Sequence, residues 1–204
     1  MKRTTAALAS LSLLGGCMSL PEVPPRDFYV LEDLAKPVAA KPGGESGRVL
    51  LVHPAAASPF YETQSLAFSR APGQRAYYQF AGWTERPARR LTELLTRRLE
   101  ALGGFRSIAS STAGVRGDVL LNLRLEEFYH DAGANPGSAR IEVSAELIDI
   151  AGRTVLARRR FAQSAPVAEE SARAAVAALS RATSGLLDEL SAWIESTAAR
   201  PAAR

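Results

Sequence analysis

The sequence predicts one α/β domain in which a mixed β-sheet packs against two main helices. Two long segments, over residues 84–102 and 167–197, repeat apolar side chains at helical spacing. The shorter runs before and between them are rich in β-branched and aromatic residues, and some alternate apolar with polar side chains as half-buried strands do. A chain of 204 residues is long enough for one such domain with its own core.

The first 16 residues have the composition of a secretory signal peptide. Lys2 and Arg3 precede residues 6–16, which contain only Ala, Leu, Ser and Gly. This apolar run is shorter than the roughly 20 residues that a membrane-spanning helix needs. The alternative is a buried first helix, but such a helix would carry polar residues at helical spacing, and no charge interrupts the run. We therefore expect residues 1–16 to be removed as a signal peptide.

The only cysteine of the chain, Cys17, directly follows this run. A disulfide needs a second cysteine, and a thiol nucleophile needs a histidine partner, whereas His53 and His130 are both far away in sequence. The motif Leu14-Gly15-Gly16-Cys17 resembles the lipobox of bacterial lipoproteins. This resemblance implies cleavage before Cys17 and lipidation of its thiol and its new amino group, with palmitate as an expected acyl chain.

Residues 17–27 are predicted to form a lipidated cysteine followed by a Pro-rich tether. The prolines favour an extended backbone, so the ten residues after Cys17 can reach roughly 30 Å at about 3.1 Å per residue. The folded domain is expected over residues 28–197, and residues 198–204 are expected to be a disordered tail. In this organisation the domain can stand off the membrane surface.

The amino-terminal part of the domain is predicted to contain two short strands and a hairpin. Residues 28–31 and 48–53 are β-rich runs, separated by a loop of Pro, Gly and Ala. Pro72-Gly73 is a turn signal with aromatic flanks, which predicts a hairpin from Ser65 to Phe80. The aromatic cluster here is expected to be core, with lipid or partner binding as the alternative; it comprises Tyr77, Tyr78, Phe80 and Trp83.

The first long helix is predicted to begin at Thr84, whose hydroxyl suits an N-cap, and to end at Gly103-Gly104. Its apolar stripe comprises Ala88, Leu91, Leu94, Leu95, Leu99 and Leu102. Four arginines fall largely off that stripe, namely Arg89, Arg90, Arg97 and Arg98. We expect them to form a solvated face, with contact to lipid headgroups as the alternative.

Residues 105–110 are a predicted strand, and the following run from Asp118 to His130 alternates regularly. Its apolar face comprises Val119, Leu121, Leu123 and Leu125. Continued alternation predicts that Glu126 and Glu127 face opposite sides of the sheet. They would then be unable to act as a paired acid and base.

The next two strands are predicted to form a hairpin whose register follows from its apolar faces. Aligning these faces gives three cross-strand pairs: Leu147 with Val155, Asp149 with Arg153, and Glu142 with Arg160. The loop is then residues 150–152, and Gly152 is expected in the left-handed conformation that commonly ends a three-residue loop. After Pro166, a helix with an alanine-rich first half is predicted over residues 167–197.

The sequence lacks the motifs of common enzyme classes. It contains no GxSxG, HExxH, CxxC, P-loop or dinucleotide-binding motif. We predict no catalytic, cofactor-binding or metal-binding residue, and we expect His53 to be a surface or hydrogen-bonded histidine. The formal charge of +4 falls to +2 once Lys2 and Arg3 are removed, which is too weak an electrostatic footprint to indicate a nucleic-acid partner.

The order of the elements resembles the ABC-type transport auxiliary lipoproteins of the paraquat-inducible protein C type. The resemblance covers Phe28 to about Ile194 and rests on five marks taken in order: FYVL, the arginine-then-tyrosine stretch before Trp83, LRLEEF, RRRF and the final helix containing Trp193. It implies an α/β domain similar in topology to the amino-terminal domain of TolB. No catalytic residues are implied.

The resemblance also implies a function and partners. Members are lipid-anchored periplasmic partners of an ABC ATPase, a permease and a mammalian-cell-entry (MCE) domain protein, which together move lipids between the two membranes. The lipoprotein would dock the periplasmic conduit at the outer membrane, in one version as a homo-oligomeric ring. Met18 and Ser19 after the cysteine favour the outer membrane by the enterobacterial sorting rule.

Two other functions remain open at this stage. One is an envelope assembly or integrity lipoprotein of TolB-like topology that binds other envelope proteins. The other is a periplasmic hydrolase with an unfamiliar active site, because the absence of motifs does not exclude an enzyme.

Overall fold

The structure is a computed structural model that describes residues 24–36 and 46–198. The predicted signal peptide, Cys17 and most of the tether lie outside the described residues. So do the middle of the loop after the first strand and residues 199–204.

Strand β7 (Val119–Asp131) is the central element of one mixed sheet, to which nine strands of the described chain belong. One edge of β7 pairs antiparallel with β8 (Ser138–Asp149) along nearly its whole length. Its other edge pairs in parallel with three strands placed end to end, which are β2 (Val49–Val52), β3 (Ala56–Ala57) and β4 (Ser65–Ser69). The long alternating run in the sequence therefore has partners on both sides.

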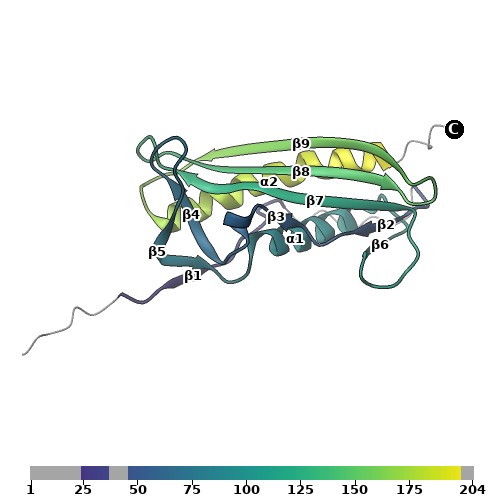
Figure 1. Cartoon of the computed structure of the whole chain (residues 1–204), viewed down its shortest axis with the longest axis horizontal. Helices are drawn as coiled ribbons and strands as arrows, with labels where there is room; N and C mark the ends of the chain where they lie inside the picture. The colour runs from purple at the N-terminus through teal and green to yellow at the C-terminus, as the bar shows by residue number, and fades with distance from the viewer. Residues whose placement is uncertain (1–23, 37–45, 199–204) are drawn as a thin grey trace, which may run out of the picture.

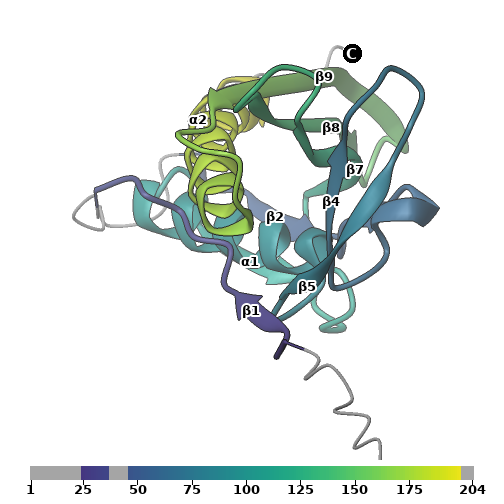
Figure 2. The same cartoon turned by 90° about the vertical axis from the view of Figure 1, so that its left-hand side faces the viewer.

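The remaining strands extend the sheet outward from these pairs. They are β5 (Ala76–Trp83) beside β4, β1 (Asp27–Tyr29) beside β5, β6 (Ser107–Ser110) beside β2, and β9 (Thr154–Pro166) beside β8. A 3-10 turn spans Pro59–Tyr61. The sheet curls, and the helices α1 (Pro87–Leu102) and α2 (Ala172–Ala198) lie on its open side (Figures 1 and 2). The predicted fold class, a mixed sheet packed against two helices, is confirmed.

Helix α1 begins two residues later than predicted, and its end is as predicted. Arg86, not Thr84, is the N-cap, and its backbone is extended at φ −61° and ψ 130°. Pro87 disfavours helical geometry at the residue before it and suits the first helical position itself, which explains the shift. At the other end, Gly103 adopts φ 72° and its amide donates to the Leu99 carbonyl.

Helix α2 also begins later than predicted, at Ala172 instead of residue 167. The Ser171 hydroxyl accepts a hydrogen bond from the Ala174 amide at 3.1 Å and so caps the helix. Val167 is buried, and its amide donates to the Gly137 carbonyl. Ala198, predicted to open the disordered tail, is instead the buried last residue of α2, and Arg48 donates to its carbonyl at 2.9 Å.

A β-bulge in β7 makes the prediction for Glu126 and Glu127 wrong. Leu125 lies opposite Val143, Glu127 lies opposite Glu142, and Glu126 is the extra residue between them. Glu126 accepts from the Ser144 hydroxyl on the outer face of β8, so both glutamates lie on the same face. An inserted residue reverses the alternation of everything that follows it, and Phe128 therefore points into the core.

The predicted register of the β8–β9 hairpin is also wrong. Leu147 lies opposite Ala157, Asp149 lies opposite Thr154, and Arg153, not Gly152, has the left-handed φ of 52°. A shift of two residues keeps side chains on their faces, so the apolar pattern fits both registers equally well. The four-residue turn decides between them, because the Asp149 carboxylate accepts the Gly152 amide at 2.7 Å.

Charge pairs in this hairpin follow the observed register. Arg160 reaches Glu142 diagonally, at 3.1 Å, although the two residues are not directly opposite as predicted. Asp149 pairs with Arg48 at 3.0 Å instead of with Arg153. A second bulge, between Leu147 and Ile148, turns Val155 outward, away from the apolar face to which it was assigned.

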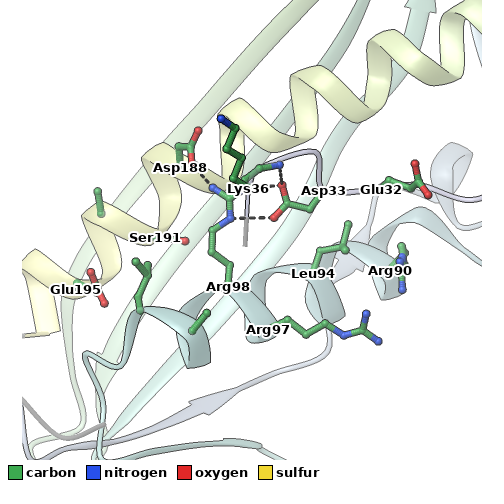
Figure 3. A pocket seen from close by; sticks show the side chains of 14 residues that line it. Glu32, Asp33, Lys36, Arg90, Leu94, Arg97, Arg98, Asp188, Ser191 and Glu195 are labelled. Atoms are coloured by element: carbon green, nitrogen blue, oxygen red, sulfur yellow. Dashed lines mark hydrogen bonds and ion pairs between the residues drawn. The ribbon is translucent and has the colours of Figure 1, made fainter. Parts of the chain in front are cut away.

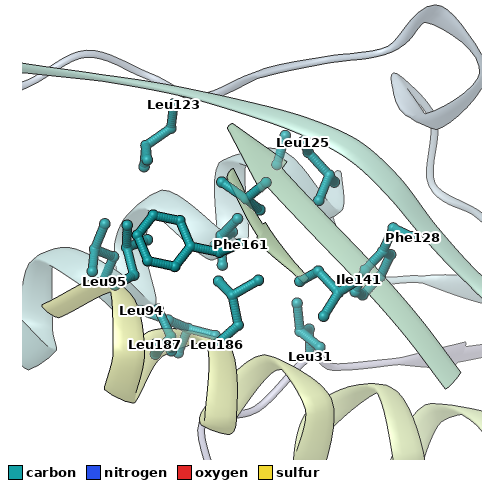
Figure 4. Packing of buried hydrophobic residues seen from close by; sticks show 14 of the residues in the cluster. Leu31, Leu94, Leu95, Leu123, Leu125, Phe128, Ile141, Phe161, Leu186 and Leu187 are labelled. Carbon is teal, nitrogen blue, oxygen red and sulfur yellow. The ribbon is translucent and has the colours of Figure 1, made fainter. Parts of the chain in front are cut away.

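The core fills the space between the curled sheet and the two helices (Figure 4). Phe161 of β9 lies at its centre, between leucines from α1, α2 and β7. Within the predicted aromatic cluster, Trp83 is buried against Phe128 and Tyr78 is partly buried. Tyr77 and Phe80 are exposed, so the expectation of a wholly buried cluster is wrong for these two.

Truncation of the central aromatic residue should be costly. Phe161 is 1% exposed, and Phe161→Ala should lower the free energy of unfolding by about 3–5 kcal/mol in urea denaturation, because it leaves a cavity among groups that relax only partly. Val155→Ala, on the exposed side of the same strand, should cost less than about 0.5 kcal/mol. Equal losses would contradict the core described above.

Candidate functional site

After β1 the chain leaves the sheet as an extended strap, residues 30–36, that contacts both helices. An extended segment outside a sheet needs other partners for its backbone groups. Two serines of α2 provide them, since Ser180 accepts the Glu32 amide at 3.3 Å and Ser184 accepts the Leu34 amide at 2.7 Å. On the other side, Arg90 of α1 donates to the Leu31 carbonyl at 2.9 Å. The strap therefore connects α1 to α2.

A set of ion pairs, here called the strap clamp, holds the middle of the strap. Arg98 of α1 donates from Nε to Asp33 Oδ2 at 2.9 Å, and a second guanidinium nitrogen contacts the other oxygen of Asp33. Its third nitrogen contacts Asp188 of α2 (Figure 3). The side chains of Arg98 and Asp33 are only 10% and 18% exposed, so this pair is shielded from solvent more than a surface ion pair is, whereas Asp188 is 68% exposed.

The environment of Asp33 favours its charged form. Burial alone would raise the pKa of the Asp33 carboxyl, but the hydrogen bonds from Arg98 and from the Ala35 amide, together with the charge of Arg98, outweigh it. The pKa of Asp33 therefore lies below its ordinary value. Asp33 is therefore ionised at neutral pH.

A cavity of about 650 Å³ lies beside the clamp, between the strap, α1 and α2 (Figure 3). The charged side chains among its described lining residues are Glu32, Asp33, Lys36, Arg90, Arg97, Arg98, Asp188 and Glu195. Acids and bases are equal in number there, so the cavity has no strong preference for an anion or a cation. The buried hydroxyl of Ser191 lines it without a hydrogen-bond partner in the described chain. None of these described lining residues is a histidine that could activate the hydroxyl.

The two histidines have structural contacts. His53 is exposed and lies 2.9 Å from the Ser111 hydroxyl, as expected of a hydrogen-bonded surface histidine. His130 is fully buried, with Nε2 2.7 Å from the Pro136 carbonyl and Nδ1 2.7 Å from the Tyr78 hydroxyl. Because a carbonyl only accepts, Nε2 is the donor in the contact with Pro136. His130 thereby ties the β7–β8 loop to β5, a role that the sequence did not reveal.

The described residues, 24–36 and 46–198, contain no group of three or more His, Cys, Asp or Glu side chains that could hold a metal ion. Over the same ranges, no helix is both long and apolar enough to cross a membrane. Cys17, the one predicted site residue, lies outside them.

The prediction that the arginines of α1 form a solvated face is only half right. Arg89 and Arg97 are exposed, whereas Arg90 and Arg98 turn toward the strap. Sequence spacing alone could not show this, because the strap lies about 60 residues away in the chain and covers only part of the polar face.

Two groups of exposed large apolar side chains lie at opposite ends of the molecule. Phe28, Val30 and Leu34 lie on β1 and the strap. Val115, Ile150 and Val155 lie in the loop after β6 and around the β8–β9 turn, and the Ile150 amide donates to the Asp118 carbonyl and joins these two segments. Figure 1 shows β1 at one end of the molecule and the β8–β9 turn at the other.

Comparison with known proteins yields a family match and structural relatives. The model of the family described as ABC-type transport auxiliary lipoprotein component matches residues 29–191. No curated protein matches the chain.

Two solved structures illustrate the likeness of fold. A Xanthomonas campestris protein of the DUF330 family superposes with a TM-score of 0.73 at 25% identity, over 84% of this chain and 96% of that one. A hypothetical protein from Chlamydia trachomatis superposes with a TM-score of 0.52 at 13% identity, over 74% of this chain and 98% of that one, which shows a shared fold alone.

Loss of the clamp cation should destabilise the domain. Arg98→Ala leaves the Asp33 carboxylate without its main partner, and we expect the free energy of unfolding at pH 7 to fall by about 2–4 kcal/mol in urea denaturation. Arg97→Ala, one residue away but exposed, should cost less than about 0.5 kcal/mol. Indistinguishable variants would show that the clamp contributes nothing.

The clamp should also make stability depend on acid pH. Because the pKa of Asp33 is lower in the folded chain, its contribution is fully present above the ordinary value of about 3.9 and is lost as pH falls through the folded value. Asp33→Asn should therefore reduce the loss of stability between about pH 4 and pH 2. Denaturation curves for both proteins across this range measure the difference, and identical slopes would contradict it.

Proposed function

Because the chain belongs to the family of ABC-type transport auxiliary lipoprotein components, we propose that it is a lipid-anchored envelope protein of a transport system. Its role in this proposal is to dock the periplasmic conduit of that system at the outer membrane. The family match over most of the chain is the observation that carries this proposal. The role is that of a binding protein, not an enzyme. The contacts of His53 and His130 and the unassisted Ser191 are consistent with it.

The proposed anchor is Cys17, acylated after removal of residues 1–16. The described chain starts a few residues later and enters β1 at Asp27. The anchor is therefore tied to the end of the molecule where β1 lies. Beyond β1, the strap transmits this attachment to both helices through Arg98, Asp33 and Asp188.

The opposite end of the molecule is the proposed docking end. It comprises the β8–β9 turn and the loop after β6, where Val115, Ile150 and Val155 are exposed. Strand β7 runs between the two ends, and its 13 residues span about 43 Å at roughly 3.3 Å per residue. Exposed aliphatic side chains at this distance from the anchor suit a protein partner in the periplasm.

The proposed partner is the MCE-domain protein of a system that also contains an ABC ATPase and a permease and that moves lipids between the two membranes. Several copies of this chain would form a ring around the end of that conduit. The outer membrane is the proposed location, and Met18 and Ser19 after the cysteine favour it.

The anchor can be tested with one substitution. Cys17→Ala should abolish labelling by a fatty-acid probe and release the protein from the membrane fraction, because the thiol that carries the acyl chain is gone. Circular dichroism of the released protein should be unchanged, since the first described element, β1, begins only at Asp27. Unchanged labelling would refute the assignment.

The partner can be tested by co-purification of the natively acylated protein from envelopes in mild detergent. We expect the MCE-domain protein, the ATPase and the permease, and we expect Ile150→Asp with Val155→Asp to abolish their recovery. Val30→Asp is a matched control, because Val30 and Val155 are both 46% exposed. Recovery of unrelated envelope proteins would instead support the assembly or integrity role, and recovery of none would reject docking.

A further inference from the structure

The outer side of β1 and the strap carries an apolar row that nothing in the described structure covers. Side chains along this extended segment alternate between two sides. Tyr29, Leu31 and Asp33 face the sheet and helices, whereas Phe28, Val30 and Leu34, here called the outer row, are 57%, 46% and 51% exposed. A segment that is apolar on both sides is typical of a strand covered on both faces.

Cations flank the outer row. Arg26 precedes it, with its guanidinium 5.5 Å from the centre of the Phe28 ring, and also donates to the Ser65 hydroxyl at 3.2 Å and the Ala81 carbonyl at 3.3 Å. Lys36 follows the row. Arg97 of α1 lines the same cavity as Lys36, and neither has an ion-pair partner in the described part of the chain. The acids nearby are Asp27, which is exposed between Arg26 and Phe28, and Glu32, which lines the cavity with Asp33, Asp188 and Glu195.

An apolar row with cations at both ends matches the surface of an anionic bilayer. Apolar side chains enter the boundary between headgroups and acyl chains, while arginine and lysine extend to the phosphates. Phe80 of β5, also exposed, lies on the strand that pairs with β1 and adds to this apolar surface.

We propose that the outer row, with Arg26, Lys36 and Arg97, rests on the surface of the anionic phospholipid membrane that holds the lipid anchor. This inference depends on the proposed anchor at Cys17. The residues between Cys17 and Phe28 reach roughly 30 Å at about 3.1 Å each, so the row stays near the bilayer.

A membrane fits this row better than a second protein does. The docking end, with a comparable set of three exposed side chains, lies at the other end of the molecule from β1, where the chain from the proposed anchor enters the fold. A tethered domain meets its own membrane at a high effective concentration, so a small patch is enough to orient it. The domain would then lie against the membrane by the strap instead of standing off it as the tether length alone allows.

The test is photo-crosslinking in native envelopes whose phospholipids carry radioactive phosphate. Phe28 is replaced by p-benzoylphenylalanine in the acylated chain, and Val155 is replaced in a parallel control. We expect a labelled lipid adduct at position 28 and none at position 155. Adding Val30→Asp should reduce the adduct at position 28 about tenfold, because a carboxylate resists entering the bilayer.

Each other outcome overturns the proposal in a recognisable way. An adduct at position 28 with a protein, either a second copy or another chain, assigns the row to a protein interface. The absence of any adduct shows that the row faces water. Membrane fractionation of the same samples tests the lipid anchor separately. Loss of the protein from the membrane fraction would show that the anchor at Cys17 is wrong. A membrane-bound protein without a lipid adduct would show that only the proposed membrane contact of the outer row is wrong.

Discussion

The structure depends on hydrogen bonding along both edges of β7. An extended strand of 13 residues exposes a row of amides and carbonyls at each edge, and both rows must be satisfied. Here β8 covers one edge, while β2, β3 and β4 share the other end to end. This arrangement creates two separate flanks, β4–β5–β1 near Asp131 and β2–β6 near Val119, and α1 crosses from one flank to the other. The two ends that the proposed function requires are consequences of this pairing.

The strap links the anchor end to the helices. A simple tether would leave the domain free to rotate at Asp27, but here the chain beyond β1 is held by Ser180, Ser184 and the strap clamp. Because the clamp joins α1 and α2 through the strap, a pull on the amino terminus acts on both helices instead of peeling a single strand. The same contacts keep Phe28, Val30 and Leu34 on one side, which allows them to meet a flat surface together.

The sequence predicted the kind and order of the elements because alternation and helical spacing are local patterns. It could not predict the two bulges, which reverse the alternation at Glu126 and near Ile148 without a local signal. The sequence also did not indicate that Arg98 is shielded from solvent, because the partner of Arg98, Asp33, is 65 residues away. Nor did it indicate that His130 is buried and contacts both Tyr78 and Pro136. Cys17 was predicted from a local sequence motif, and it lies outside the described residues.

In the proposed function, one end of the molecule faces the membrane and the other faces the periplasmic conduit. The most direct test places p-benzoylphenylalanine at Ile150, in the β8–β9 turn, and irradiates intact envelopes. The account predicts a covalent adduct with the MCE-domain protein and no adduct with lipid. A lipid adduct at this position, or an adduct only with an unrelated envelope protein, would contradict it.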